Sequence, residues 1–278
     1  MPSRKIYAGL TLWNGAYIMT IVFVIFSFAA LIVAFVMEGG HLAGLLSPTA
    51  AIIVIGGTIG ATAVTIPLEI LKNTGRLLVI AMGNRKNNMI EFINYFNRLS
   101  IKARKEGLLA LESDMGSADV DPFIRKGISL AVDGTNPELI KSIMDTQIEQ
   151  ISKRHKSQIQ IFESAGGYAP TMGILGTVMG LVHVLSNLAN AGELGAQIAT
   201  AFLATMYGIG TANLMWLPIA GKLKALNVIE MKEKLMIMEA VLSITSGDNP
   251  QVMVQKLKVF LDPDELREYE KAEGGNSV

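Results

Sequence analysis

Residues 15–37 read GAYIMTIVFVIFSFAALIVAFVM, an apolar run of 23 residues without a charged side chain. An α-helix needs about 20 mostly apolar residues to cross the hydrocarbon layer of a bilayer. The run is too long for the apolar core of a cleaved signal peptide, and no small-residue cleavage site leads from it into a soluble domain. It therefore predicts a membrane-spanning helix.

Three further stretches have the length and composition of membrane spans, namely 49–66, 165–189 and 197–220. The short loop 38–48 joins the first two spans, and its glycines and Pro48 indicate a tight turn. The loop 190–196 joins the last two. The sequence thus predicts four transmembrane helices in two pairs.

The composition agrees with a membrane protein. Half of the 278 residues are apolar, 17% are charged, and the net charge is zero, whereas a soluble domain carries roughly 25% charged residues. This excludes an ordinary water-soluble protein and a disordered chain, and the lack of cysteine excludes a disulfide scaffold. Without net charge there is no basic field for nucleic acid.

The basic residues predict the orientation. No Lys or Arg lies between Lys5 and Lys72, or between Lys156 and Lys222. Cytoplasmic loops carry an excess of basic residues, so both termini and the central region are expected in the cytoplasm and both short loops outside. The predicted division is a first transmembrane pair (1–67), a cytoplasmic helical domain (68–164), a second transmembrane pair (165–221), and a cytoplasmic C-terminal helix with a tail (222–278).

The charged regions are predicted to be helical. They show neither the alternating pattern of strands nor a hairpin signal. Asp121-Pro122 and Asn136-Pro137 are typical of helix starts, and Gly134 of a helix end. The last two spans are expected to continue into long cytoplasmic helices. The predicted fold is therefore all-α: a polytopic membrane protein with four transmembrane helices and a helical cytoplasmic domain.

The chain lacks the residues of most enzymes. No GxxxxGK[ST] phosphate loop and no Ser/His/Asp arrangement is present, and the three His, at 41, 155 and 183, are too far apart for a metal site. We expect no enzymatic activity, metal or cofactor. No Asp or Glu lies deep in a span, and His183 is the only ionisable candidate there. Either the chain conducts nothing, or a partner helix brings the carboxylate.

Small residues in the spans predict close helix packing. Gly56 with Gly60, and Gly176 with Gly180, have the small-xxx-small spacing. The span 197–220 also holds many Ala and Gly around its threonines, which suits packing around a partner helix. The alternative is ordinary helix packing, with each Thr bonded to its own helix.

Four motifs resemble one known family, the A subunits of the flagellar stator (MotA/PomA). They are SPTAAIIVIGGT at 47–58, RKEGLLALE at 104–112 with DGT at 133–135, APTMGILGTVMG at 169–180, and ATMYG at 204–208 followed by Asn213 and Pro218. The GTVMG piece is shared with the wider family that includes TolQ and ExbB. The combination with RKEGLLALE is specific to stators.

This resemblance implies a function. Stator A subunits form a pentamer around a dimer of B subunits (MotB/PomB) in the bacterial inner membrane. The B helix brings an aspartate that binds H⁺ or Na⁺, which agrees with the lack of a deep acid here. Ion passage then drives the A ring, and its cytoplasmic part pushes on the rotor protein FliG.

The resemblance also implies site residues. Arg104 and Glu112 match the charged pair that faces the rotor, and Thr177 and Thr205 match positions that face the ion path. A hydroxyl at Thr177 favours Na⁺ over H⁺, because it can coordinate a dehydrated cation. The solvated face of a helix is the alternative for the charged pair.

Two prolines match positions near the cytoplasmic side of the membrane. Pro170 and Pro218 each lack a backbone N–H and can kink a helix, which suits a hinge beside a moving partner. The alternative for Pro170 is a proline at the start of a helix.

Three other classes of protein share some of these features. A TolQ/ExbB-like energiser of outer-membrane processes has three spans, and the extra apolar pair before residue 68 argues against it. A self-contained transporter needs its own intramembrane site, for which only His183 qualifies. A structural membrane protein without ion coupling is the third.

Overall fold

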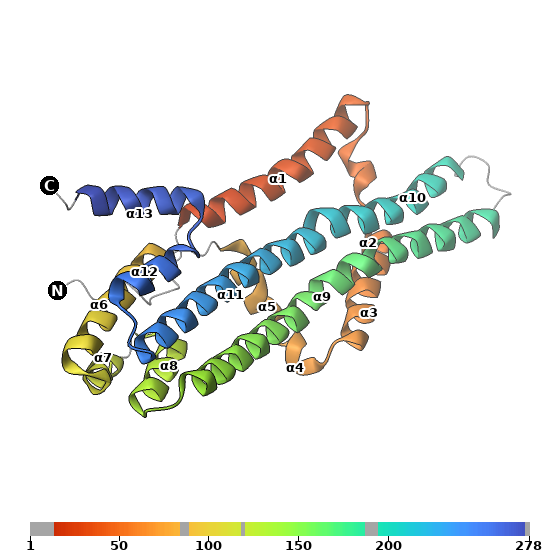
Figure 1. Cartoon of the computed structure of the whole chain (residues 1–278). Coiled ribbons are helices and arrows are strands. Elements are labelled where there is room, and N and C mark those ends of the chain that lie inside the picture. The colour runs from red at the N-terminus through yellow and green to blue at the C-terminus, as the bar shows by residue number, and fades with distance from the viewer. Residues whose placement is uncertain (1–13, 84–88, 118–119, 187–193, 276–278) are drawn as a thin grey trace. The chain divides into compact units, whose positions relative to one another are not determined.

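The structure is a computed structural model, and it describes residues 14–83, 89–117, 120–186 and 194–275. Every regular element in these ranges is a helix (Figure 1). The prediction of an all-helical chain is therefore confirmed for the described residues.

The apolar helices coincide with the predicted spans. They are α1 (Asn14–Met37), the succession α2 (Pro48–Ala51), η2 (Ile52–Gly56) and α3 (Gly57–Thr65), α9 (Pro137–Ser186), and the succession α10 (Leu194–Thr211), η5 (Ala212–Trp216) and α11 (Leu217–Thr245). Among the described residues, three helices are long and apolar enough to cross a membrane: Leu42–Thr65, Pro137–Ser186 and Leu194–Thr245. Val22–Met37, within α1, is a shorter apolar helix. The count of four spans stays a prediction.

Two helices confirm the predicted long extensions. α9 has 50 residues and begins at Pro137, far before the apolar stretch that it contains. Leu194–Thr245 is likewise one succession of 52 residues. The predicted loop 190–196 and the end of the span 165–189 lie largely outside the described residues.

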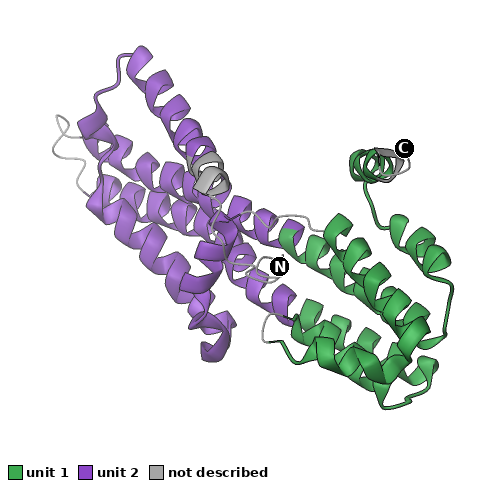
Figure 2. Ribbon diagram, turned by 90° about the vertical axis from the view of Figure 1, so that its left-hand side faces the viewer, with its two compact units in different colours: residues 1–11, 85–153, 226–278 green, residues 12–84, 154–225 purple. Residues whose placement is uncertain are grey.

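The chain folds into two compact units (Figure 2). Unit 1 comprises residues 1–11, 85–153 and 226–278, and unit 2 comprises residues 12–84 and 154–225. Unit 2 contains the apolar helices together with α4 (Leu68–Leu71) and α5 (Thr74–Met82).

Unit 1 is a helical bundle with its own apolar core. It contains α6 (Met89–Glu106), η3 (Leu108–Leu111), α7 (Glu112–Met115), α8 (Pro122–Val132), the start of α9, the end of α11, α12 (Pro250–Lys258) and α13 (Pro263–Gly275). Phe96, Ile124, Met144 and Met236 are among its fully buried side chains. Such burial contributes roughly 1.5–3 kcal/mol per large apolar side chain.

The predicted helix ends in unit 1 are confirmed. Asp121 caps α8, since its carboxylate accepts a hydrogen bond from the Phe123 N–H at 2.7 Å. The Asn136 side chain accepts from the Glu138 N–H at 2.8 Å, at the start of α9. Gly134 follows α8 with a φ of +73°, a conformation that favours glycine.

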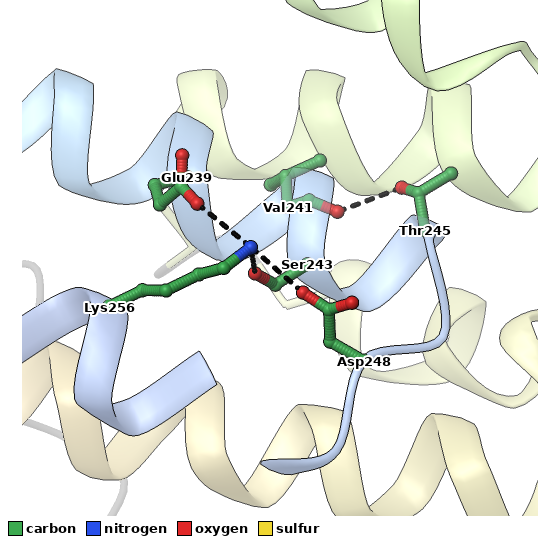
Figure 3. A network of polar contacts seen from close by, with 6 residues as sticks. All are labelled: Glu239, Val241, Ser243, Thr245, Asp248 and Lys256. Carbon is green, nitrogen blue, oxygen red and sulfur yellow. Dashed lines mark hydrogen bonds and ion pairs between the residues drawn. The ribbon is translucent and has the colours of Figure 1, made fainter. Parts of the chain in front are cut away.

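A polar corner joins α11 to α12 (Figure 3). Lys256 Nζ lies 2.9 Å from an Asp248 carboxylate oxygen, 3.3 Å from Glu239 Oε1, and 3.3 Å from the hydroxyl of the buried Ser243. The hydrogen bond from Lys256 lowers the pKa of Asp248, and the bond to Asp248 raises the pKa of Lys256. The ion pair therefore stabilises the corner at pH values between the lowered pKa of Asp248 and the raised pKa of Lys256. Its contribution disappears as the pH falls through the lowered Asp248 pKa.

One ion pair in unit 1 is nearly buried. Lys234 Nζ donates to both carboxylate oxygens of Asp121, at 2.9 and 3.1 Å, and lies 5.0 Å from the centre of the Phe123 ring. The Lys234 side chain is only 8% exposed. Asp121 therefore both caps α8 and neutralises a buried cation.

Replacing Asp121 with alanine is expected to destabilise unit 1 by about 3–5 kcal/mol, because it leaves the buried Lys234 ammonium without its partner. Asp262→Asn is the control, since it breaks the Asp262–Lys232 pair, whose carboxylate is 63% exposed, and should cost less than about 1 kcal/mol. Denaturant unfolding of the purified chain measures both. Equal losses from the two substitutions would contradict the structural role of Asp121.

Candidate functional site

Within unit 2, α9 and α10 lie side by side at very short distance (Figure 1). A Cβ added to Gly173 would lie 2.7 Å from the Ala204 carbonyl oxygen, and one added to Gly208 would lie 2.5 Å from the Ala169 carbonyl oxygen. Only glycine allows the two backbones to approach in this way.

The predicted packing of Gly176 and Gly180 is confirmed. A Cβ at Gly176 would lie 2.7 Å from the Ala204 Cβ, and one at Gly180 would lie 2.6 Å from the Ala201 Cβ. For Gly56 and Gly60, no atom of this chain lies within 4 Å of an added Cβ, so their packing against another helix stays a prediction.

In that helix the close contact is made by Gly57 instead. A Cβ at Gly57 would lie 2.8 Å from the sulfur of Met172 on α9. Within this chain, the contact between this helix and α9 is therefore made by a glycine outside the small-xxx-small pair.

The close packing brings Thr177 and Thr205 together. Thr177 stands on α9 and Thr205 on α10, 28 residues apart, and their hydroxyl oxygens are 2.5 Å from each other. Thr177 Oγ1 is also 3.0 Å from the Ala201 carbonyl oxygen and 3.2 Å from that of Gly173. Both threonines are half-buried.

This cluster is a set of hard oxygen ligands. Two hydroxyls and two backbone carbonyls meet where the helices are closest, and each hydroxyl has one hydrogen to donate. With its single hydrogen, Thr177 can donate within its own helix to the Gly173 carbonyl, as the alternative interpretation predicted, or across to the Ala201 carbonyl of α10; its contact with the Thr205 hydroxyl is also across to α10. The segments 165–186 and 194–221 hold no Asp or Glu. The cluster therefore offers oxygens of the kind that hard cations prefer, and neither of these two segments supplies a carboxylate to neutralise a cation.

Pro170 lies inside α9, 33 residues after its first residue Pro137. The alternative of a proline at the start of a helix is therefore wrong. Since Pro170 has no N–H, the carbonyl of Gly166 lacks its usual helical partner, a common cause of kinks.

Pro218 follows a second irregular turn. η5 is a π-helical turn, in which the Leu217 N–H reaches back five residues to the Ala212 carbonyl, and Pro218 comes directly after it. A Cβ at Gly166 would lie 2.5 Å from Leu217 Cδ2, so this turn and the carbonyl freed by Pro170 are neighbours. π-helical turns occur frequently at functional sites.

Tyr207 was not predicted as a site residue. Its hydroxyl donates to the Leu45 carbonyl at 2.5 Å and accepts from the Ser47 N–H at 3.2 Å. It thereby fixes the short loop before α2 onto α10. The one signal in the sequence was its place in the ATMYG motif.

The second predicted group lies in unit 1. Arg104 is in the last turn of α6, Glu112 is the first residue of α7, and both side chains are exposed. Neither forms an ion pair or side-chain hydrogen bond with another described residue. The two are therefore not paired with each other but offer a positive and a negative charge to solvent.

The neighbouring charges hold this surface in place. Lys102 on α6 donates to Asp114 on α7 at 2.7 Å and to Ser113 at 3.1 Å. Between the helices, Gly107 turns the chain with a φ of +85°. Burial, followed by the Asp114 charge, raises the pKa of the nearby Tyr95 to about 12, so Tyr95 stays neutral. The contacts of Lys102 thus hold α6 and α7, which carry Arg104 and Glu112, in place relative to each other.

Two family models match the chain. The model of the MotA/TolQ/ExbB proton channel family matches residues 117–236, and the model of the motility protein A N-terminal region matches residues 21–107.

Known proteins of the same kind are similar over nearly the whole length. Motility protein A of Bacillus subtilis (strain 168) is 40% identical over 91% of this chain and 94% of its own length. The chemotaxis protein PomA of Vibrio alginolyticus is 31% identical, over 87% and 94%.

Solved structures agree. The flagellar MotAB stator complex from Bacillus subtilis contains a chain that matches with a TM-score of 0.83 and 38% identity, over 90% of this chain and 98% of that chain. The MotAB of C. jejuni matches with a TM-score of 0.84 and 30% identity, over 90% and 97%.

Proposed function

The chain belongs to the MotA/TolQ/ExbB proton channel family, among its motility A proteins, and we propose that it is the A subunit of a flagellar stator that couples ion flow to torque on the rotor. The observation that carries this proposal is the match to chains of solved MotAB stator complexes over almost their full length. It is a channel subunit and not an enzyme.

The alternative of a TolQ/ExbB-like energiser is not favoured. The chain also matches the motility protein A N-terminal model over residues 21–107, the part that holds the extra apolar pair. That region is what separates stator A subunits from three-span relatives.

In the membrane, Thr177 and Thr205 form part of the ion path. Because 165–186 and 194–221 hold no acid, the path needs a carboxylate from a partner of MotB or PomB type. The chain's own oxygens then replace part of the water around the ion, and no resident cofactor is needed. The coupling ion is H⁺ or Na⁺, and the Thr177 hydroxyl favours Na⁺ because it can coordinate a bare cation.

The proposed assembly is a ring of A subunits around the B partner. Five copies surround a dimer of the B partner in the bacterial inner membrane, each with four spans and both termini in the cytoplasm. Pro170 and Pro218, beside the π-helical turn η5, serve as the hinge that lets α9 and α10 follow the partner's protonation or sodium binding.

At the rotor, Arg104 and Glu112 meet opposite charges on FliG. Complementary charges give register and fast association more than affinity. The exposure of both side chains, and the lack of an ion pair from either to another described residue, support this role.

Reversing Arg104 or Glu112, as Arg104→Glu or Glu112→Lys, is expected to reduce swimming strongly and leave membrane assembly intact, because like charges then face each other across the rotor contact. Lys141→Glu and Asp145→Lys are matched controls, since both residues are exposed on α9 in unit 1 and should tolerate reversal. Swimming speed and the amount of protein in the membrane are the measurements. Normal swimming of the Arg104→Glu, Glu112→Lys double variant would contradict the rotor contact.

The function itself is tested by deletion and by reconstitution. Deleting the gene should leave flagella assembled but not rotating. The purified chain alone, in vesicles, should pass no ions, whereas the chain purified with its B partner should pass them. Rotating flagella in the deletion strain, or an ion leak through the chain alone, would overturn the proposal.

A further inference from the structure

A short segment leaves the membrane helices of unit 2 at residues 67–82, and we call it the exit segment. It starts two residues after the last residue of α3, Thr65, and contains α4 and α5. One side of α5 is anchored, because Leu77 and Ala81 are buried in a cluster with Phe162 of α9 and Leu223 of α11. α5 therefore packs against α9 and α11 rather than lying apart from them.

The other side of the exit segment is apolar and uncovered. Leu68 is 69% exposed, Val79 52% and Ile80 40%. An exposed apolar set of this kind, directly after a membrane span, is typical of contact with lipid or protein.

Two cations lie beside these apolar residues. Lys72 and Arg76 are both exposed and are four residues apart, and Arg76 precedes Val79 and Ile80 by three and four residues. Residues three or four apart share one face of a helix, so Arg76, Val79 and Ile80 point outward together. Neither Lys72 nor Arg76 forms an ion pair with another described residue.

The surroundings are positive as well. The six basic residues of unit 2 all lie near this cluster, on the exit segment or on the adjoining parts of α9 and α11: Lys72, Arg76, Arg154, Lys156, Lys222 and Lys224. Only two acids lie at this end, Glu69 and Glu163, and Glu163 is already paired with Lys224. The local charge therefore favours an anionic partner.

We propose that the exit segment lies in the membrane interface and binds anionic phospholipid, with Lys72 and Arg76 on the headgroup phosphates and Val79 and Ile80 among the first acyl carbons. Charge and apolar surface occur side by side on one face, which matches a lipid molecule with an anionic head and an apolar tail. A soluble acidic protein could pair with the two cations, but it would leave the neighbouring apolar side chains without an apolar contact.

The proposal rests on the membrane location in the proposed function, but not on ion coupling or rotor contact. Its readout is therefore a lipid response and not swimming. A chain that responds to lipid but does not support rotation would refute the stator proposal alone, and the reverse result would refute only the lipid site.

The test uses the full chain, purified from membranes in detergent together with any partner that stays bound. Its melting temperature is measured with added phosphatidylglycerol, with phosphatidylcholine of the same acyl chains, and with inorganic phosphate. We expect phosphatidylglycerol to raise the melting temperature by several degrees more than phosphatidylcholine, and phosphate to leave it unchanged. High salt should weaken the difference, because it screens exposed charges.

The variants locate the effect. Lys72→Gln with Arg76→Gln should remove most of the difference between the two lipids, while Lys72→Arg with Arg76→Lys should keep it. Lys141→Gln removes an exposed cation from unit 1 and should keep it too. The Gln pair breaks no ion pair among the described residues, so it should melt like the unaltered chain when no lipid is added.

Three results would overturn the proposal. They are equal shifts with the two lipids, an undiminished phosphatidylglycerol shift in the Gln pair, and a shift of the same size with inorganic phosphate alone. The last would assign the cations to a soluble anion instead of lipid.

Discussion

Replacing Gly208 with alanine is expected to abolish rotation, although alanine is a better helix former than glycine by about 1 kcal/mol. The new methyl group would lie 2.5 Å from the Ala169 carbonyl oxygen and 3.0 Å from Gly173 Cα. These are backbone atoms and cannot turn away, so α9 and α10 must separate. Such overpacking costs typically 1–3 kcal/mol, and the separation also parts Thr177 from Thr205.

Gly210 and Gly221 provide the matched controls. They belong to the same succession of helices, and a Cβ at either would meet no atom of this chain within 4 Å. Their alanine variants should be as stable as the unaltered chain or more stable. Melting temperature in detergent and swimming speed are the measurements. A Gly208→Ala chain that melts and swims like Gly210→Ala would show that the close approach of the helices is not required.

Replacing Thr177 with valine is expected to lower swimming speed sharply in a sodium-driven motor. Valine keeps the branched shape and removes the hydroxyl, which lies 2.5 Å from the Thr205 hydroxyl and 3.0 Å from the Ala201 carbonyl oxygen. If that oxygen lowers the barrier to ion passage by about 1.4 kcal/mol, its loss slows passage about tenfold. A proton needs less, because it can sit on the partner's carboxylate alone.

Thr177→Ser is the control for this experiment, since it retains the hydroxyl. Speed is measured against Na⁺ concentration at fixed pH, with a protonophore added in parallel. The serine variant should keep its sodium dependence and the valine variant should lose most of its speed. A motor that ignores Na⁺ and stops with the protonophore would show that the ion is H⁺ and that the argument from Thr177 is wrong.

The sequence predicted those features that are set by local chemistry. Long apolar runs gave the membrane helices, and Asp121-Pro122 gave the start of α8, because a side-chain cap and a proline act within one turn. The family motifs placed both Thr177 and Thr205 at the ion path, but they did not predict the contact between the two hydroxyls. Its geometry depends on the glycines that let α9 and α10 meet.

Features set by distant parts of the chain could not be predicted in the same way. Gly56 and Gly57 differ by one position, and the contact of Gly57 with Met172 of α9 depends on how the two helices pack. Tyr207 bonds to backbone groups about 160 residues away, a pairing that no local pattern encodes. A proline is common in the first turn of a helix, yet Pro170 lies in the interior of the 50-residue α9.

The π-helical turn η5 also affects how the length of this chain can change. Each residue advances a regular helix by about 100°, so a deletion within α10 would turn every later side chain to a different neighbour. A π-helical turn holds one residue more than an α-helical turn of similar rise. Losing one residue from Ala212–Trp216 would restore an ordinary turn and leave Thr205 before it and Leu223 after it facing the same partners. The succession Leu194–Thr245 thus contains one place where the gene can lose a codon without altering the phase of the helix on either side.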